Sequence, residues 1–148
     1  MTEKKRILFV DDEPSNITAV SEILLEAEMD VKTVTTVQAA VEALHHSRFD
    51  VIVTDIFIPM GQKPEQILGP RARRYAENLR HLGGLALLDE LERMDNPPTI
   101  LAHTACTDYA LIEILGDHVE ERVPKPAPVD VLLQAIMRAL SPERRWGF

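Results

Sequence analysis

The sequence has little cysteine, little positive charge and no long hydrophobic run. Its only cysteine, Cys106, cannot form a disulfide within the chain, which indicates a reducing compartment, and we expect a cytoplasmic protein. The apolar run nearest the N-terminus lasts only from Ile7 to Val10, too short for a signal peptide or a membrane span. Lys and Arg number 16 against 24 Asp and Glu, a formal net charge of −8. This acidity argues against a general binder of nucleic acids or anionic membranes, so we expect neither as a partner.

The chain is nevertheless long and apolar enough to fold as one domain. It has 148 residues, of which 45% are hydrophobic, so a full core is expected. We assign residues 1–148 to a single domain. Its core is expected at about 5–140, with an insertion at about 61–82 and a C-terminal tail at 141–148.

One stretch, residues 49–60, organises the rest of the chain. Its three consecutive β-branched residues, 51–53, predict a strand buried on both faces. The strand leads to a carboxylate, Asp55, and Pro59 then prevents further regular pairing. In open α/β folds, ligands bind at this carboxyl end of the strands. We therefore expect Asp55 at a functional edge of a parallel sheet.

Strand-like and helix-like segments alternate along the chain. Strands are predicted at 6–10, 31–34, 51–55, 99–103 and 118–123, and helices at 17–27, 37–44, 87–94, 107–115 and 129–140. Thr36 is the expected cap of the second helix, and Gly83-Gly84 is expected to break the chain before the third. The last strand is so charged that we place it at an edge. Alternation with short connections predicts a three-layer, doubly wound α/β domain with a five-stranded parallel sheet.

Five polar residues follow or end four of these strands. They are Asp11, Asp12, Asp55, Thr104 and Lys125. The carboxyl ends of parallel strands share one edge of the sheet, so these side chains are expected to meet. Three neighbouring carboxylates repel one another, and Mg²⁺ with oxygen ligands would relieve that repulsion. Asp55 would then be a nucleophile that forms an aspartyl phosphate, with the lysine and threonine on the phosphoryl oxygens.

These motifs resemble the receiver domain of two-component response regulators, the CheY-like group of flavodoxin-like folds. The matching pieces are 7–14, 51–55 with Pro59, Thr104-Ala105, Lys125-Pro126 and the helix at 84–91. The resemblance covers about residues 5–140 apart from the insertion between the third strand and the third helix, and it implies strand order 2-1-3-4-5.

The resemblance also implies roles for individual residues. Mg²⁺ would be held by Asp11, Asp12, Asp55 and the backbone carbonyl of Phe57, with Asp12 the more direct ligand of the acidic pair. Thr104 and Lys125 would contact the phosphoryl group. A cis bond between Lys125 and Pro126 is compatible with this pattern.

A receiver of this kind is a signalling switch. It would take a phosphoryl group from a sensor histidine kinase or phosphotransfer protein and change its binding to a downstream partner protein. It is not expected to be an enzyme beyond catalysing its own phosphorylation and dephosphorylation. A homodimer remains one option.

Simpler readings of the same residues stay open. Asp11-Asp12 is also suited to capping a helix, and Asp55, Thr104 and Lys125 to ordinary strand-end turns. The protein as a whole is alternatively an interaction module that no longer depends on phosphorylation. A phosphohydrolase of the haloacid-dehalogenase type fits less well. Its pattern places two aspartates one residue apart after the first strand, and Asp11-Asp12-Glu13 lacks this pattern.

The sequence departs from the receiver pattern in three places. The insertion at 61–82 is either a solvated excursion or a functional element, such as a specificity segment, a dimer contact or a lid. Arg122 stands where receivers carry Tyr or Phe, so we hypothesise an Arg–carboxylate rearrangement with Glu120 or Glu113. Phe57 and Cys106 flank the expected path of the hydrolytic water, which predicts a long-lived phosphoryl group.

The remaining metal-binding residue types show no functional pattern. His45, His46 and His103 are interpreted as structural or exposed, and Cys106 as a small packing residue.

Overall fold

The computed structural model describes residues 4–59, 83–105, 113 and 119–141. Within these ranges the chain forms one five-stranded sheet, in which every neighbouring pair of strands is parallel. The strands are β1 (Arg6–Val10), β2 (Asp30–Val34), β3 (Val51–Thr54), β4 (Thr99–Thr104) and β5 (Glu121–Pro124). Their order across the sheet is β2-β1-β3-β4-β5, which confirms the expected order and fold class.

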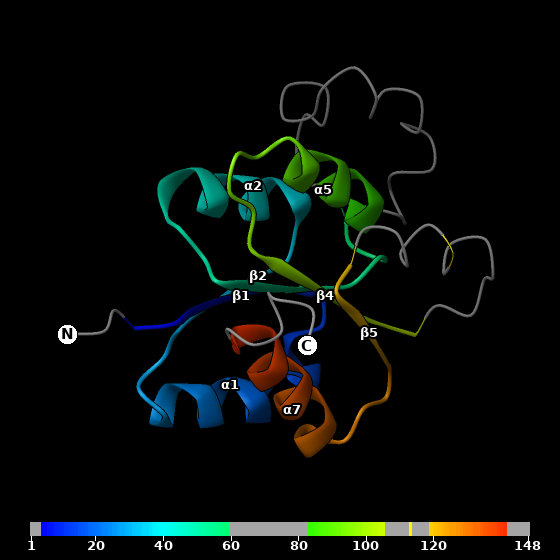
Figure 1. Ribbon diagram of the computed structural model, residues 1–148. Coiled ribbons are helices and arrows are strands. Elements are labelled where there is room, and N and C mark those ends of the chain that lie inside the picture. Colours follow the sequence, from blue (N-terminus) through cyan, green and yellow to red (C-terminus); the bar gives the residue numbers. More distant parts are fainter. Residues whose placement is uncertain (1–3, 60–82, 106–112, 114–118, 142–148) are drawn as a thin grey trace.

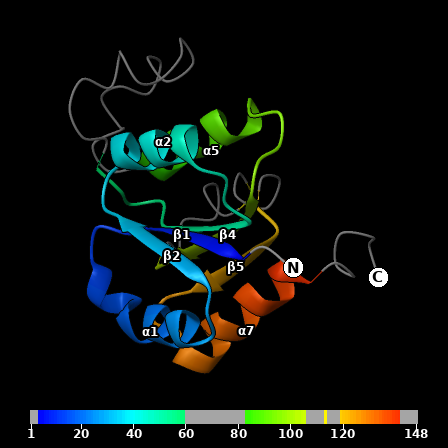
Figure 2. The same cartoon turned by 90° about the vertical axis from the view of Figure 1, so that its left-hand side faces the viewer.

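Helices cover both faces of the sheet, as Figures 1 and 2 show. The helices α2 (Val37–His46) and α5 (Gly83–Glu92) lie on one face, and α1 (Thr18–Glu26) and α7 (Val129–Leu140) lie on the other. A short 3₁₀ helix, η1 (Pro14–Asn16), precedes α1. No helix among the described residues is long and apolar enough to cross a membrane.

The apolar residues divide into two cores, one on each face of the sheet. Strand residues alternate between the two cores, because successive side chains of a strand point to opposite faces. In β1, Leu8 and Val10 face the α2/α5 core, whereas Ile7 and Phe9 face the α1/α7 core. All four residues of β3 are buried, since this strand lies in the middle of the sheet. Both cores therefore fix the position of β3, the strand that leads to Asp55.

Most predicted elements are present with boundaries close to those expected. The hydroxyl of Thr36 accepts a hydrogen bond from the Ala39 N–H at 3.0 Å, which confirms the expected helix cap. The charged strand β5 lies at the edge of the sheet, as expected, but it begins at Glu121 rather than at residue 118. The expectation that Gly83-Gly84 interrupts the chain is wrong, because both glycines belong to the first turn of α5.

Several predictions concern residues outside the described part of the chain. They include the insertion at 61–82, the C-terminal tail beyond residue 141, Cys106 and all but one residue of the helix expected at 107–115. The exception, Glu113, is helical.

Candidate functional site

The sheet itself holds the backbone of three predicted site residues. The Asp11 N–H donates to the carbonyl of the last residue of β2 at 3.0 Å, and the Asp55 N–H donates to the last residue of β1 at 3.1 Å. The Lys125 N–H donates to the carbonyl that ends β4 at 3.0 Å. Each of these residues directly follows a regular strand and still bonds to the neighbouring strand. The sheet therefore holds the backbone of the site in place.

A lysine joins two buried carboxylates at this edge. The Lys125 Nζ lies 2.8 Å from Asp11 Oδ2 and 2.8 Å from Asp55 Oδ2. Asp11 is 3% exposed and Asp55 is 6% exposed. Buried charges are costly unless they are paired, so the lysine stabilises both carboxylates in this arrangement.

The second oxygen of Asp11 supports the local turn. Asp11 Oδ1 accepts the N–H of Glu13 at 2.9 Å, just before η1 begins. The capping interpretation is wrong for Asp11, because neither η1 nor α1 has a side-chain cap and this bond lies in the turn before η1. The same side chain nevertheless directs its other oxygen into the cluster with Lys125.

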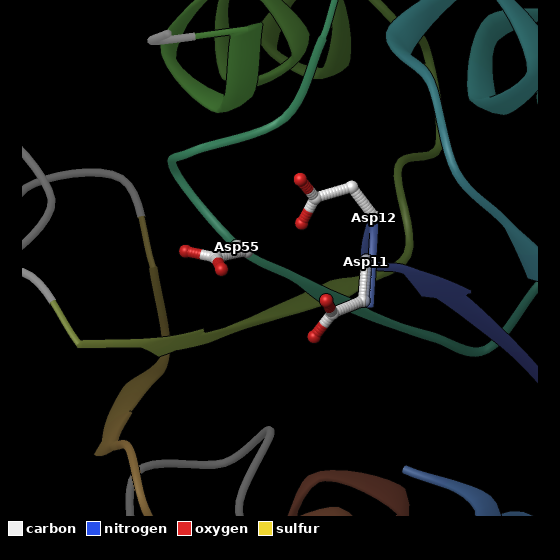
Figure 3. Close-up of side chains that lie close together, drawn as sticks. All are labelled: Asp11, Asp12 and Asp55. Carbon is white, nitrogen blue, oxygen red and sulfur yellow. The ribbon is translucent and has the colours of Figure 1, made fainter. Parts of the chain in front are cut away.

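Asp12 completes a group of three carboxylates, shown in Figure 3 on the loops after β1 and β3. One oxygen from each of Asp11, Asp12 and Asp55 lies within 4.8 Å of the others. Asp12 is the exposed member of the three. Three carboxylates and one ammonium leave a formal charge of −2, and hard oxygen donors are the ligands that Mg²⁺ prefers. The residues present therefore fit a divalent cation that enters from the side of Asp12.

The electrostatic environment shifts two pKa values in this group. Partial burial, followed by repulsion from Asp11 and Asp55, raises the pKa of Asp12 above its ordinary value. Burial lowers the pKa of Lys125, but the hydrogen bonds from its ammonium to Asp11 and Asp55 outweigh that effect, and the net shift is upward. Apart from the effect of burial, both shifts include a contribution from the negative charges of Asp11 and Asp55.

Asp55 Oδ1 is held by the backbone that follows it. The Ile56 N–H donates to this oxygen at 2.7 Å and the Phe57 N–H donates to it at 3.3 Å. With Lys125 on Oδ2, both carboxylate oxygens of Asp55 have fixed donors. The side chain is therefore pre-oriented at the sheet edge.

The structure places the other predicted site residues at the same edge. Thr104 is the last residue of β4, and its side chain is fully buried. Phe57 is 39% exposed, two residues beyond Asp55. The bond between Lys125 and Pro126 is cis. The residues expected to converge do share one edge of the sheet, whereas their proposed roles in metal and phosphoryl binding stay predictions.

His103 differs from His45 and His46, although the sequence offered no reason to distinguish the three. Its side chain is only 3% exposed, and its Nδ1 has no hydrogen-bond partner among the described residues. Burial, followed by the positive charge of Lys125, lowers its pKa. The only sequence signal for this burial was the position of His103 at the end of an apolar strand. The lowered pKa favours a neutral imidazole, on the face of the sheet that α1 and α7 cover.

The two cavities that stand out among the described residues lie away from this cluster. The larger, about 590 Å³, is lined by the end of α2 and by the segments that precede β3 and β4. These segments lie at the amino ends of β3 and β4, whereas the carboxylate cluster lies at the carboxyl ends of the strands. The cavities are therefore not part of the carboxylate site.

Comparison with known proteins places these observations in a family context. The model of the response regulator receiver domain family matches residues 7–62. No curated protein matches the chain.

Solved structures with a similar fold include several receiver domains. The chemotaxis response regulator CheY4 of Vibrio cholerae is 22% identical, with a TM-score of 0.69 over 93% of this chain and 100% of that chain. The receiver domain of the sensor histidine kinase PA1611 from Pseudomonas aeruginosa PAO1, which has a magnesium ion coordinated in its active-site cleft, is 22% identical. Its TM-score is 0.68, over 93% of this chain and 98% of that chain. The signal receiver domain of a putative Luxo repressor protein from Vibrio parahaemolyticus is 19% identical, with a TM-score of 0.69 over 93% and 91% of the two chains. At these identities the likeness shows the fold.

Proposed function

We propose that the chain is a receiver domain, a switch in which Asp55 accepts a phosphoryl group from a phosphohistidine of a partner protein; the match of residues 7–62 to the receiver family model and the shared fold support this. The partner is a sensor histidine kinase or a phosphotransfer protein. The receiver family match supports this class of partner. A downstream protein would then recognise the phosphorylated form.

The observation that supports this proposal best is the contact between Lys125 and the two buried aspartates. The ammonium lies 2.8 Å from Asp55 Oδ2, the side on which a phosphoryl group on that oxygen would project its own oxygens. A lysine is a compact, strongly charged donor suited to a phosphoryl oxygen. A purely structural turn would not need a lysine between two carboxylates that are themselves nearly inaccessible to solvent.

Mg²⁺ would be held by Asp11, Asp12, Asp55 and the carbonyl of Phe57. When bound, it supplies positive charge that offsets the charge of the incoming phosphoryl group. A related receiver domain has magnesium in its active-site cleft, and the acidic cluster of this chain offers the same kind of donor. The exposed Asp12 gives the cation a direct approach from solvent.

The transfer needs little chemistry from the protein beyond orientation. A carboxylate oxygen of Asp55 attacks phosphorus, the phosphorus–nitrogen bond of the phosphohistidine breaks, and its electron pair returns to the imidazole. The Ile56 and Phe57 N–H groups hold the attacking side chain in place. Lys125 and the hydroxyl of Thr104 bind the phosphoryl oxygens. Positioning and charge neutralisation of this type account for most of the catalysis of phosphoryl transfer.

The response to phosphorylation is proposed to differ from the usual receiver mechanism. Arg122 occupies the position of the usual aromatic residue, and it is exposed on the edge strand β5. On the neighbouring residue, Glu121 accepts two hydrogen bonds from Arg138 of α7, at 3.2 and 2.6 Å. These bonds tie β5 to α7 on one face, so a rearrangement of Arg122 would take place on the other face.

The proposal is tested by phosphorylation with acetyl phosphate, followed by intact-mass measurement. We expect one added phosphoryl group on the wild type with Mg²⁺, and none on Asp55→Ala. Lys32→Met, which removes an exposed lysine of β2, serves as a control and should behave like the wild type. No uptake by the wild type with Mg²⁺, or equal uptake by Asp55→Ala, would contradict the proposal.

A further inference from the structure

Gly84 lies unusually close to the peptide that follows Asp55. A Cβ atom added to Gly84 would lie 2.3 Å from the Asp55 carbonyl oxygen and 2.5 Å from the Ile56 Cα. Ordinary contacts of a Cβ begin at 3.4 Å, so a side chain would be about 1 Å too close to the backbone. Both neighbours are backbone atoms at the end of the central strand, and neither can move without displacing Asp55.

A hydrogen bond fixes the same approach. The Gly84 N–H donates to the Ile56 carbonyl at 2.9 Å, and the Ile58 N–H donates to that carbonyl at 3.0 Å. On its other side, Ile56 donates its own N–H to Asp55 Oδ1 at 2.7 Å. Ile56 is therefore held by the first turn of α5 at one end and holds the carboxylate at the other.

From this geometry, we propose that Gly84 is a positioning residue for phosphoryl transfer to Asp55. Its missing side chain lets the first turn of α5 rest on the Asp55–Ile56 peptide. Its N–H bonds the carbonyl of the next peptide, Ile56–Phe57, whose own N–H donates to Asp55 Oδ1. The role is indirect, because Gly84 touches the backbone behind the carboxylate and not the carboxylate itself. The proposal rests on Asp55 being the phosphoryl acceptor.

Helix propensity and the close approach predict opposite effects of Gly84→Ala on the stability of the protein. Alanine favours a helix over glycine, so Gly84→Ala in α5 would stabilise the protein if the position were unconstrained. The close approach predicts the opposite, a lower melting temperature together with a displaced Asp55. A displacement of about 1 Å at a reacting group can slow a reaction on the order of a hundredfold.

The test compares Gly84→Ala with Ala86→Gly, which weakens the same helix two residues further on without adding an atom near Asp55. Phosphorylation by acetyl phosphate is measured at saturating Mg²⁺ and phosphodonor, and the amide shifts of Ile56 and Phe57 are measured by NMR without phosphodonor. Gly84→Ala should shift both amides and slow phosphorylation by about ten- to a hundredfold. Ala86→Gly should lower the melting temperature but keep the amide shifts and a phosphorylation rate close to that of the wild type.

The two readouts separate failure of this inference from failure of the proposed function. A folded Gly84→Ala protein with wild-type amide shifts and a wild-type rate would overturn the positioning role while leaving Asp55 as the acceptor. An equal loss of rate in Ala86→Gly would also overturn it, because the effect would then be one of helix stability. If the wild type took up no phosphate, the proposed function would fail, and unperturbed amides in Gly84→Ala would still refute the structural part.

Discussion

Replacing Lys125 with methionine should make folding depend on a divalent cation. The variant keeps most of the side-chain volume but removes the ammonium that lies 2.8 Å from both Asp11 Oδ2 and Asp55 Oδ2. At an effective dielectric constant of about 20, each attraction is worth about 6 kcal/mol before desolvation is subtracted. Removing one partner from a buried charge group has a net cost of about 3–5 kcal/mol. The side chains of Lys125, Asp11 and Asp55 are only 14%, 4% and 7% exposed, so solvent screening does not remove this cost.

The expected loss is large enough to measure by thermal unfolding. For a chain of this size, about 1 kcal/mol corresponds to roughly 2–4 °C, so the variant should melt about 6–20 °C below the wild type without Mg²⁺. Adding Mg²⁺ should restore much of the difference, since a cation at 100 times its dissociation constant contributes about 2.7 kcal/mol. Arg138→Met, which breaks the exposed pair with Glu121, is the matched control and should change the melting temperature little.

Alkaline pH provides a second measurement on the same lysine. The pKa of Lys125 is raised in the folded protein, so its contribution to stability is complete below the unfolded-state pKa of about 10.4. That contribution is lost as the pH rises through the raised value. The wild type should therefore lose more stability than Lys125→Met above about pH 10.4. Equal stability of the two proteins at neutral pH without Mg²⁺, or a loss that Mg²⁺ does not relieve, would refute the reasoning.

Four further substitutions have definite expected outcomes. Asp12→Asn should raise the melting temperature at neutral pH without Mg²⁺, because the raised pKa of Asp12 shows that its charge opposes folding, and it should remove most of the stabilisation by Mg²⁺ in calorimetry. Thr36→Ala should cost about 1 kcal/mol in chemical unfolding, through loss of the bond to the third residue of α2; an unchanged midpoint would show that the cap contributes nothing. Phe57→Asn should shorten the lifetime of the phosphoryl group on Asp55 by opening the half-exposed side of the site to water, and an unchanged decay rate would contradict this. Arg122→Ala should weaken the dependence of partner binding on phosphorylation, measured as the affinity ratio of the two forms; an unchanged ratio would exclude the proposed rearrangement.

The parts of the fold that the sequence predicted depend on local patterns. Three consecutive β-branched residues placed β3 in the middle of the sheet, and all of its residues are buried. A threonine before an apolar helical stripe predicted the start of α2, and its hydroxyl makes the expected bond. Charge alone placed β5 at an edge. These predictions are confirmed because each depends only on residues a few positions away in the sequence.

Strand ends were harder to predict than strand positions. β5 begins three residues later than expected, because a short charged edge strand is determined by pairing with β4 and not by its own composition. Gly83-Gly84 was expected to break the chain, since glycine disfavours helices. This pair instead begins α5, and at Gly84 the backbone of Asp55 comes too close for a side chain.

The candidate site shows the same division. That Asp11, Asp12, Asp55 and Lys125 share one edge of the sheet followed from their positions at the ends of parallel strands. That Lys125 bridges two aspartates with equal distances of 2.8 Å did not, because side-chain contacts depend on packing across the whole sheet. For the burial of His103 the sequence offered only its position at the end of an apolar strand, which does not distinguish a buried histidine from an exposed one.

The claim on which this account depends most is that Asp55 itself carries the phosphoryl group. Borohydride reduces an acyl phosphate of aspartate to homoserine, so treatment of the phosphorylated protein followed by peptide mass spectrometry locates the modified residue. We predict homoserine at position 55, formed only when Mg²⁺ and a phosphodonor are both present. Homoserine at Asp11 or Asp12, or unmodified aspartate at position 55 in a protein that has taken up phosphate, would contradict it.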